Sequence, residues 1–255
     1  MCIRDRKFSI IIATYNAESA IRMTLESIRR QKCKEFELLI VDGGSSDSTC
    51  KICKEYQDIV SIMISEKDKG LYDAWNKGIA LAKGEWILFV GAGDLLSEDA
   101  LMNYLFFLNN HTECFDYISA VVIRCNNQGH ELSRIKGEWT WDTFRKVMNV
   151  AHVASLHNRI LFQEVGVFDI NYKICADYEL LLRKRDRLKA GFVDFVVAKM
   201  PIGGCSFSTN ALFESVRAKI RSGGQPKIES YFYALIQYAM LKTFKIRHSN
   251  YLRLK

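Results

Sequence analysis

Carboxylates that follow apolar segments are the side chains of this sequence best suited to chemistry. Asp94 comes directly after Gly91-Ala-Gly, which itself follows the apolar run Trp86–Val90. Glycines let a ligand approach the backbone closely, and a hard divalent cation prefers carboxylate oxygens. Asp94 is therefore a candidate metal ligand, and the alternative is that it begins an ordinary turn.

Two further residues could contact a nucleotide. Asp42 ends the apolar run Phe36–Val41 and could accept hydrogen bonds from a base or ribose, as acids at this position do in nucleotide-binding folds; the alternative is an Asx-turn. Tyr15 could stack on a base or could simply pack. Neither the glycine-rich dinucleotide motif nor the P-loop motif is present, which argues against those two binding modes.

A second acidic pair, Asp177 and Glu179, stands at the predicted start of a helix. Such a carboxylate could act as a general base that removes a proton from an acceptor hydroxyl, or it could only stabilise the helix dipole. His152 and His157 stand five positions apart. This spacing disfavours a metal pair and leaves two interpretations, structural histidines or a contact to an acceptor.

Apolar, β-branched runs alternate with amphipathic segments through the first half of the chain, which predicts an α/β fold. Because each strand run is apolar throughout, helices should cover a mostly parallel sheet on both faces. Ligands bind at the carboxyl ends of such strands, so the loops 13–16, 42–47 and 91–94 should line one crevice. The predicted strands are Phe8–Ala13, Phe36–Val41, Ile59–Ile64 and Trp86–Val90, and the predicted helices include Ile21–Ile28 and Leu71–Lys83.

The second half is more mixed and should rest on the sheet, where it would face a second substrate. Its predicted elements are strands at Tyr117–Arg124 and Phe192–Val197, short helices at Thr140–Met148 and Arg159–Val165, and a longer helix at Asp177–Lys189.

The composition of the 255 residues, 49% hydrophobic and 25% charged, is that of an ordinary globular protein. The net charge of +7 could favour binding to nucleic acid, to an anionic membrane or to a phosphate-bearing ligand. No apolar run reaches the roughly 18–20 residues of a spanning helix, and Met1–Lys7 lacks the apolar core of a signal peptide, so we expect a cytoplasmic protein. The lone C-x-x-C pair, Cys50 and Cys53, lies inside a helical pattern, which favours reduced, structural cysteines.

Taken in order, the segments Ser9–Asn16, Leu39–Thr49, Asp68–Gly78, Gly84–Asp94 and Ala176–Arg183 carry a family resemblance. They resemble the family 2 glycosyltransferases of the GT-A fold, especially bacterial enzymes that build exopolysaccharide and lipopolysaccharide chains. The resemblance covers about residues 8–208. It implies an inverting transferase that uses a nucleoside diphosphate sugar together with Mg²⁺ or Mn²⁺.

The resemblance also implies roles for individual residues. Thr14, Tyr15 and Asn16, with Asp42, would hold the base and ribose. Asp94 matches the final acid of the family's D-x-D metal motif, and Asp177 matches its catalytic base. The remaining predicted nucleotide-sugar contacts are Gly43, Ser45, Asp47, Lys69 and Asp73, and the predicted acceptor contacts are His152, Glu179 and Arg183.

The sequence departs from the family pattern at two points. The family often shows a second acid beside Asp42 and an acid where Ala92 or Gly93 stands. Base recognition and metal binding should therefore each rest on one carboxylate, and the diphosphate should carry most of the ion's ligands. Pro201–Ser206 resembles a loop that closes over the donor, with a plain turn as the alternative.

We expect four regions: a non-native or disordered leader at 1–7, a nucleotide-sugar-binding half at 8–125, an acceptor and catalytic half of the same domain at 126–210, and a basic amphipathic helical tail at 211–255. The tail suits a peripheral contact with the anionic inner face of the plasma membrane, where a lipid-linked acceptor would be found. The alternative interpretation is that the tail packs against the domain. Nucleic acid is not an expected partner.

The predicted function is sugar transfer to a glycan or lipid-linked acceptor in cell-surface polysaccharide synthesis. One alternative is a nucleotidyltransferase that forms sugar nucleotides, but its glycine-rich signature with Arg and Lys does not follow the first strand, where Ala13–Glu18 stands. Another is a non-catalytic nucleotide-sugar binder, which the presence of both Asp94 and Asp177 disfavours.

Overall fold

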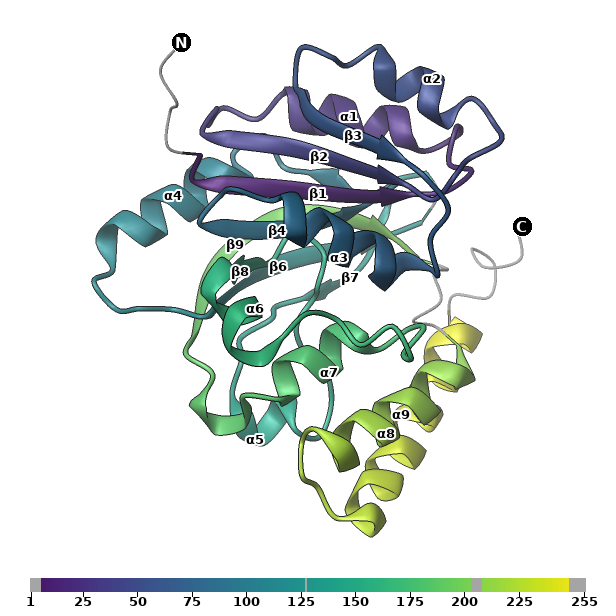
Figure 1. The fold of residues 1–255 in the computed structure, drawn as a ribbon. Helices are drawn as coiled ribbons and strands as arrows, with labels where there is room; N and C mark the ends of the chain where they lie inside the picture. Colours follow the sequence, from purple (N-terminus) through teal and green to yellow (C-terminus); the bar gives the residue numbers. More distant parts are fainter. Residues whose placement is uncertain (1–5, 127, 203–207, 248–255) are drawn as a thin grey trace.

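The computed structural model of the chain describes residues 6–126, 128–202 and 208–247 and forms one sheet with helices on both faces (Figure 1). The 9-stranded sheet has the order β3-β2-β1-β4-β8-β6-β9-β5, and β7 pairs with β6. The strands are β1 Phe8–Thr14, β2 Phe36–Asp42, β3 Val60–Ser65, β4 Trp86–Gly91, β5 Leu95–Leu96, β6 Tyr117–Cys125, β7 Glu131–Ile135, β8 Leu156–Asn158 and β9 Ala190–Pro201. The helices are α1 Ile21–Arg29, α2 Thr49–Lys54, α3 Leu71–Leu81, α4 Ala100–Asn110, α5 Trp141–Phe144, α6 Arg159–Val165, α7 Ala176–Leu182, α8 Thr209–Arg221 and α9 Lys227–Arg247, with a 3₁₀ turn at Arg185–Arg187.

The first four strands of the sheet order are parallel, as their apolar runs predict. β1 lies between β2 and β4, and its Thr14 is in register with Asp42 while Ala13 is in register with Gly91. Parallel neighbours in this register end at one edge of the sheet. The loops that follow β1, β2 and β4 are therefore neighbours in space.

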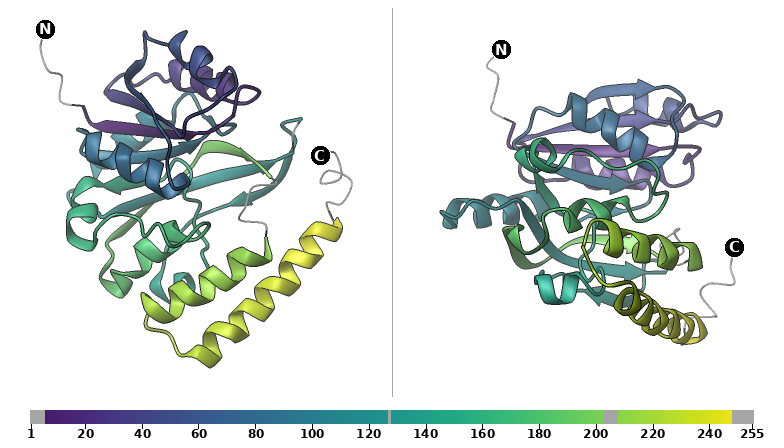
Figure 2. Two further views of the ribbon diagram at one scale, coloured as in Figure 1. Left: turned by 45° about the vertical axis from the view of Figure 1, so that its right-hand side comes forward. Right: turned by 60° about the horizontal axis from the view of Figure 1, so that its bottom comes forward.

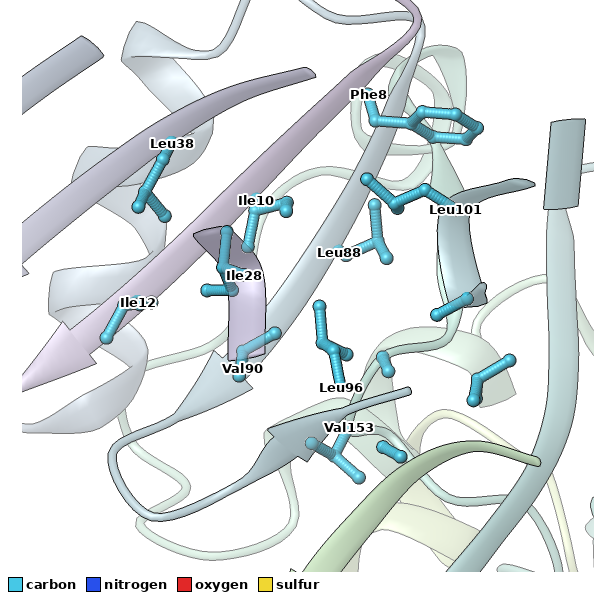
Figure 3. Packing of buried hydrophobic residues seen from close by; sticks show 14 of the residues in the cluster. Phe8, Ile10, Ile12, Ile28, Leu38, Leu88, Val90, Leu96, Leu101 and Val153 are labelled. Carbon is cyan, nitrogen blue, oxygen red and sulfur yellow. The ribbon is translucent and has the colours of Figure 1, made fainter. Parts of the chain in front are cut away.

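The two faces of this sheet belong to two separate cores. Ile10, Ile12 and Leu88 pack with α1, α2 and α4 on one face, which Figure 3 shows from close by. Ile11 and Phe89 point to the other face and pack with α3, α6 and α7. Each fully buried Ile or Leu contributes about 1.5–3 kcal/mol, so the alternation along these strands fixes both helical layers.

The second half of the chain confirms some predicted elements and corrects others. The helix Arg159–Val165 has the predicted bounds, but the predicted helix Thr140–Met148 is reduced to α5, Trp141–Phe144. The predicted helix Asp177–Lys189 is wrong in length, because α7 ends at Leu182 and Arg185 then adopts φ +53°. That left-handed residue breaks the helix and leads through the 3₁₀ turn into β9.

The helices α8 and α9 form an antiparallel pair at the end of the molecule away from β1–β3 (Figure 2). α8 lies between α7 and α9, so α9 is the outer helix. The predicted boundary at residue 210 falls within α8. In the described part of the chain, no helix combines the length and apolar character that a membrane crossing requires. The predicted donor-covering loop, apart from Pro201 and Ile202, and residues 1–5 of the predicted leader lie outside the described residues.

Candidate active site

The loop after β2 is organised around Asp42, whose side chain is fully buried. Its Oδ2 accepts the backbone N–H groups of Gly44 and Ser45 and the hydroxyl of Ser65, and its Oδ1 accepts the Ser45 hydroxyl. Burial alone raises the pKa of Asp42, but these hydrogen bonds outweigh it and hold the pKa below its ordinary value. Both oxygens are thus committed to the loop, as the Asx-turn interpretation expects.

The loop after β1 is fastened to the loop after β2. The backbone N–H of Asn16 donates to Ser45 Oγ, and Asn16 Oδ1 accepts from the Ser46 N–H at 2.9 Å. Asn16 holds φ at +47°, a left-handed value that Asn tolerates better than most residues. Asp47 adds a further tie by accepting the N–H of Glu18. Asn16, Ser45 and Asp47 thus shape the site from within.

Two side chains at this edge have unused binding capacity. Tyr15 is 64% exposed beside the sheet edge, where a flat ligand could stack on its ring. The Thr14 hydroxyl is buried and has no hydrogen-bond partner within residues 6–126, 128–202 and 208–247. A buried hydroxyl without a partner is costly, so this group fits a ligand or water at the strand end.

Asp94 stands three residues beyond β4, where the turn places its carboxylate back over the strand end. Its Oδ2 accepts the Gly91 N–H at 2.9 Å, and the described residues offer it no ion pair. Burial raises the pKa of Asp94 to about 7, and the single bond from Gly91 opposes that rise only in part. A cation near this carboxylate would supply the charge that the protein does not.

The fit of a divalent cation can be judged from this donor set. The described residues contain no group of three or more His, Cys, Asp and Glu side chains able to hold a metal ion. One half-buried carboxylate matches a Mg²⁺ or Mn²⁺ ion that takes its other oxygens from a diphosphate and water. Asp94 therefore fits a shared metal site and does not fit an all-protein one.

Asp177 lies half-buried at the start of α7, facing α3. Its Oδ1 accepts the Tyr178 N–H. It also shares the Tyr72 hydroxyl proton, at 3.2 Å, with the Ile174 carbonyl, which lies nearer that hydroxyl at 2.6 Å. Burial raises the pKa of Asp177 to about 6, and these two hydrogen bonds only moderate the rise. The Tyr72 contact and a bond from Lys173 Nζ to the Lys69 carbonyl bring the start of α7 to the loop that follows β3.

The loop before α3 contains two of the predicted residues, Lys69 and Asp73. The Lys69 N–H donates to Asp73 Oδ2 at 3.0 Å, so Asp73 caps the start of α3. The Lys69 side chain is exposed at the same edge of the sheet. It is thus free to meet an anion, whereas Asp73 is engaged in the helix cap.

The predicted acceptor residues fall into two groups. Glu179 and Arg183 form a partly buried ion pair, and Arg183 also donates to the carbonyls of Val165 and Val167. Ser222, which directly follows α8, donates a further hydrogen bond to Glu179. These contacts hold α7 against its neighbours and occupy both charged groups.

His152 instead lies in an aromatic cluster on the α3 side of the sheet. Its ring is 4.8 Å from Trp75, 5.0 Å from Phe89 and 4.9 Å from His157, centroid to centroid. Burial lowers the pKa of His152 well below its ordinary value and lowers that of His157 to about 4, so both rings are neutral at pH 7. The two ring nitrogens of His152 have no hydrogen-bond partner among the described residues.

Sequence reasoning missed two residues that position the candidate base. Tyr72 contacts Asp177 directly, and Glu214 of α8 accepts the N–H groups of Lys173, Ile174 and Cys175. Glu214 is 37 residues from Asp177 along the chain, so spacing alone carries no signal of the contact. Tyr72 lies within a matching segment and could have been chosen with its neighbours.

This fold and this sheet edge define a glycosyltransferase of the GT-A type. The chain belongs to the family described as Glycosyl transferase family 2, whose model matches residues 9–166. It is 36% identical over 180 residues to a PGL/p-HBAD biosynthesis glycosyltransferase of Mycobacterium bovis, covering 69% of this chain and 68% of that relative. This membership confirms the predicted transferase and decides against the nucleotidyltransferase.

Solved structures support the same fold at low sequence identity. TarS 1-349 of S. aureus in complex with UDP-GlcNAc is 20% identical with a TM-score of 0.68, covering 98% of this chain and 76% of that one. A mannosyltransferase of Pyrobaculum calidifontis in complex with GDP-Man and Mn²⁺ is 16% identical with a TM-score of 0.67, covering 94% of this chain and 75% of that one.

Proposed function

We propose that this glycosyltransferase moves a sugar, with inversion, from a nucleoside diphosphate sugar to a hydroxyl of a glycan or lipid-linked acceptor. The observation that carries the proposal is the pair of carboxylates in different surroundings, Asp94 at the end of β4 and Asp177 at the start of α7. Among the described residues, Asp94 has a single backbone donor and no ion pair, which suits a metal ligand, whereas Asp177 is oriented by two donors, which suits a base. The ligands in the two structural neighbours, UDP-GlcNAc and GDP-Man, support the donor class.

In this mechanism Asp177 is the general base. Tyr72 and the Tyr178 N–H orient its carboxylate, which takes the proton of the acceptor hydroxyl as that oxygen bonds to the anomeric carbon. The bond from the anomeric carbon to the diphosphate breaks on the opposite face. The Lys69 ammonium, exposed at the same edge, offsets charge that grows on the leaving diphosphate.

Asp94 would hold Mg²⁺ or Mn²⁺, which stabilises the diphosphate when bound. Tyr15 and the Thr14 hydroxyl would face the base and ribose, while Asn16, Asp42, Gly43, Ser45 and Asp47 would shape the loops that receive them. Asp73 would hold Lys69 in place through its cap of α3. His152, whose ring nitrogens are buried among Trp75, Phe89 and His157, would support the acceptor side of the site by packing and not by touching an acceptor.

We further propose a peripheral contact of α9 with an anionic membrane surface, where a lipid-linked acceptor would be met in cell-surface polysaccharide synthesis. Ile228, Phe232 and Leu235 are exposed along this outer helix, and Lys227 and Lys242 are exposed at either end of that run. Apolar side chains between basic ones match lipid tails beneath anionic headgroups. This charge pattern favours a lipid surface over a second copy of the chain.

A donor panel tests the proposed function. UDP-, dTDP-, GDP-, CDP- and ADP-sugars are each added with Mn²⁺, and thermal unfolding and donor hydrolysis are measured. At least one donor should raise the unfolding temperature and should be hydrolysed slowly with metal present. If every donor leaves the unfolding temperature unchanged, the function is not sugar transfer from these nucleotides.

A further inference from the structure

The space left by Gly43 is filled by a carboxylate from another loop. A Cβ built on Gly43 would lie 2.6 Å from Asp68 Oδ2 and 3.4 Å from Tyr15 Cδ2. Asp68 follows β3, and its loop is held beside the loop after β2 by a hydrogen bond from the Glu66 N–H to the Asp42 carbonyl. A side chain at position 43 and the Asp68 carboxylate would therefore compete for one place.

Asp68 has one oxygen engaged and one available. Its Oδ1 accepts the Gly70 N–H at 2.8 Å, which fixes the carboxylate in place. Its Oδ2 is the oxygen nearest the space over Gly43 and the ring of Tyr15. Asp42 cannot supply an equivalent free oxygen, because both of its oxygens accept bonds from its own loop and from Ser65.

The geometry points to Asp68 as the residue that selects the donor's base, a role that rests on the proposed function. A base stacked on the exposed ring of Tyr15 would present its edge to Asp68 Oδ2. A carboxylate oxygen accepts hydrogen bonds and donates none, so it selects a base with a ring N–H. At the ring nitrogen, uracil and thymine offer the donor N3–H, whereas cytosine and adenine present a lone pair that the carboxylate repels and carry their donors on exocyclic amino groups beside it.

Guanine is the less suitable ligand for this carboxylate. It presents two parallel donors, which call for both carboxylate oxygens in a bidentate contact. Asp68 Oδ1 is already turned toward the Gly70 N–H, leaving Oδ2 for a single donor. The base chosen by this site is therefore uracil or thymine.

The test measures the dissociation constants of UDP, dTDP, GDP, CDP and ADP by calorimetry with Mn²⁺ present. Wild type should bind UDP and dTDP at least about tenfold more tightly than the other three, because a missing partner at a polar contact is costly. Asp68→Asn should weaken UDP binding about tenfold and leave CDP within about twofold. Glu66→Gln, on the same loop but paired with Lys77, should leave all five values unchanged.

A transplanted acid keeps the test decisive if Asp68→Asn disturbs the loop. Gly43→Asp alone should weaken UDP binding, since its Cβ would already lie 2.6 Å from Asp68 Oδ2 and the two carboxylates would compete for one place. Gly43→Asp combined with Asp68→Ala should restore the preference for UDP over CDP. Gly43 has no left-handed φ that would strain an aspartate there.

The outcomes separate this inference from the proposed function. Wild type that binds nucleotides without preferring UDP or dTDP would overturn the role of Asp68 and leave the function standing. An unchanged UDP preference in Asp68→Asn would do the same. Failure of all five nucleotides to bind would overturn the proposed function and this inference together.

Discussion

At the scale of single residues, the two acids of the site differ in what surrounds them. Asp94 has one hydrogen bond, from Gly91, and the pKa of this carboxyl is raised by burial to about 7. Asp177 has two hydrogen bonds and, through burial, a pKa of about 6. A base with a pKa near neutrality is ionised at pH 7 and still accepts a proton readily.

The titration of Asp177 should appear in the pH dependence of catalysis. Only the ionised carboxylate can accept a proton, so the rate of donor hydrolysis should rise with pH through about 6 and then level off. Tyr72→Phe removes a hydrogen bond that favours the ionised form, so this limb should move up by roughly half a pH unit to one unit.

Asp177→Asn should keep donor affinity, lose this pH limb and slow the reaction about 10²–10⁴-fold. Donor calorimetry and a pH–rate profile of both variants check these expectations. A profile that keeps its limb near pH 6 in Asp177→Asn would assign the base elsewhere.

Residue identity indicated part of the candidate site, and the rest of its arrangement depends on hydrogen bonds between loops. Asp94 and Asp177 could be chosen from the sequence because each follows a recognisable segment boundary. The burial of Asp42 could not be predicted, since it depends on Ser65 from a different strand. The filling of the Gly43 position by Asp68 likewise depends on how two loops lie in space.

At the scale of elements, a buried glutamate joins three parts of the first sheet half. Glu37 of β2 accepts the Ser9 hydroxyl of β1 and the N–H groups of Lys83 and Gly84 before β4, and it pairs with Arg6. Burial raises the pKa of Glu37, but the bonds from Ser9, Lys83 and Arg6 outweigh it, and the net shift is downward. A lowered pKa stabilises the fold above the ordinary pKa of a glutamate, and that contribution is lost as pH falls.

Glu37→Gln should therefore lower the free energy of unfolding by about 3 kcal/mol at pH 7, because one amide cannot serve all these donors. The cost should shrink as pH falls below the ordinary pKa of a glutamate and through the lowered pKa of Glu37, where wild type loses the charge as well. Denaturant titrations at both pH values measure it. Glu85→Gln, which removes an exposed pair with Lys7, should cost less than about 1 kcal/mol; equal costs in the two variants would contradict the role of Glu37.

Glu214 gives a second prediction at this scale. It binds three consecutive N–H groups in the segment that leads into α7, so it positions Asp177 without touching it. Glu214→Ala should lower the rate of donor hydrolysis about tenfold at saturating donor while leaving donor affinity within about twofold. Steady-state kinetics and calorimetry separate the two quantities.

Glu164 is an exposed acid on α6 that pairs with Lys184. Glu164→Gln is therefore the matched control and should leave the rate and the donor affinity unchanged. A loss of donor affinity in Glu214→Ala equal to the loss of rate would contradict a positioning role.

An element could be predicted accurately where neighbouring residues in the sequence determine it, and less accurately where contacts with distant residues do. β1, β2 and β4 were predicted within one or two residues because each is a continuous apolar run. The end of α7 was missed because the sequence remains helical in pattern to Lys189, while Arg185 adopts a left-handed backbone. The three-residue strand β8 depends on pairing with β4 and β6 and has too few residues for a periodic signal.

At the scale of the whole molecule, the predicted α/β fold is confirmed, and its second half is where the sheet ceases to be parallel. β8 pairs antiparallel with β4, and β6 and β9 then continue the sheet toward α5 and α7 (Figure 1). α8 is tied to the region of α7 through Glu214 and through Ser222, which follows its last turn, so α8 lies beside the candidate site. α9 is left as the outer element, which agrees with a contact outside the chain.

Vesicle flotation tests that contact. The protein should float with vesicles of phosphatidylglycerol and phosphatidylcholine, should float less as salt rises, and should stay behind with phosphatidylcholine alone. Phe232→Ser combined with Leu235→Ser should reduce flotation at least about fivefold, because each substitution removes exposed apolar surface that the lipid would bury. Met102→Ser, an exposed apolar residue on α4, is the control. Equal flotation with neutral vesicles, or dimerisation in place of flotation, would contradict an anionic lipid surface.

We propose that Asp94 carries the metal that holds a nucleotide-sugar's diphosphate. The most direct measurement is calorimetric binding of the best donor to wild type and to Asp94→Asn, each with Mn²⁺ and with excess chelator. Wild type should bind the donor at least about tenfold more tightly with Mn²⁺, and Asp94→Asn should bind it equally weakly in both conditions. Equal metal dependence in the two proteins would show that the ion does not rest on Asp94.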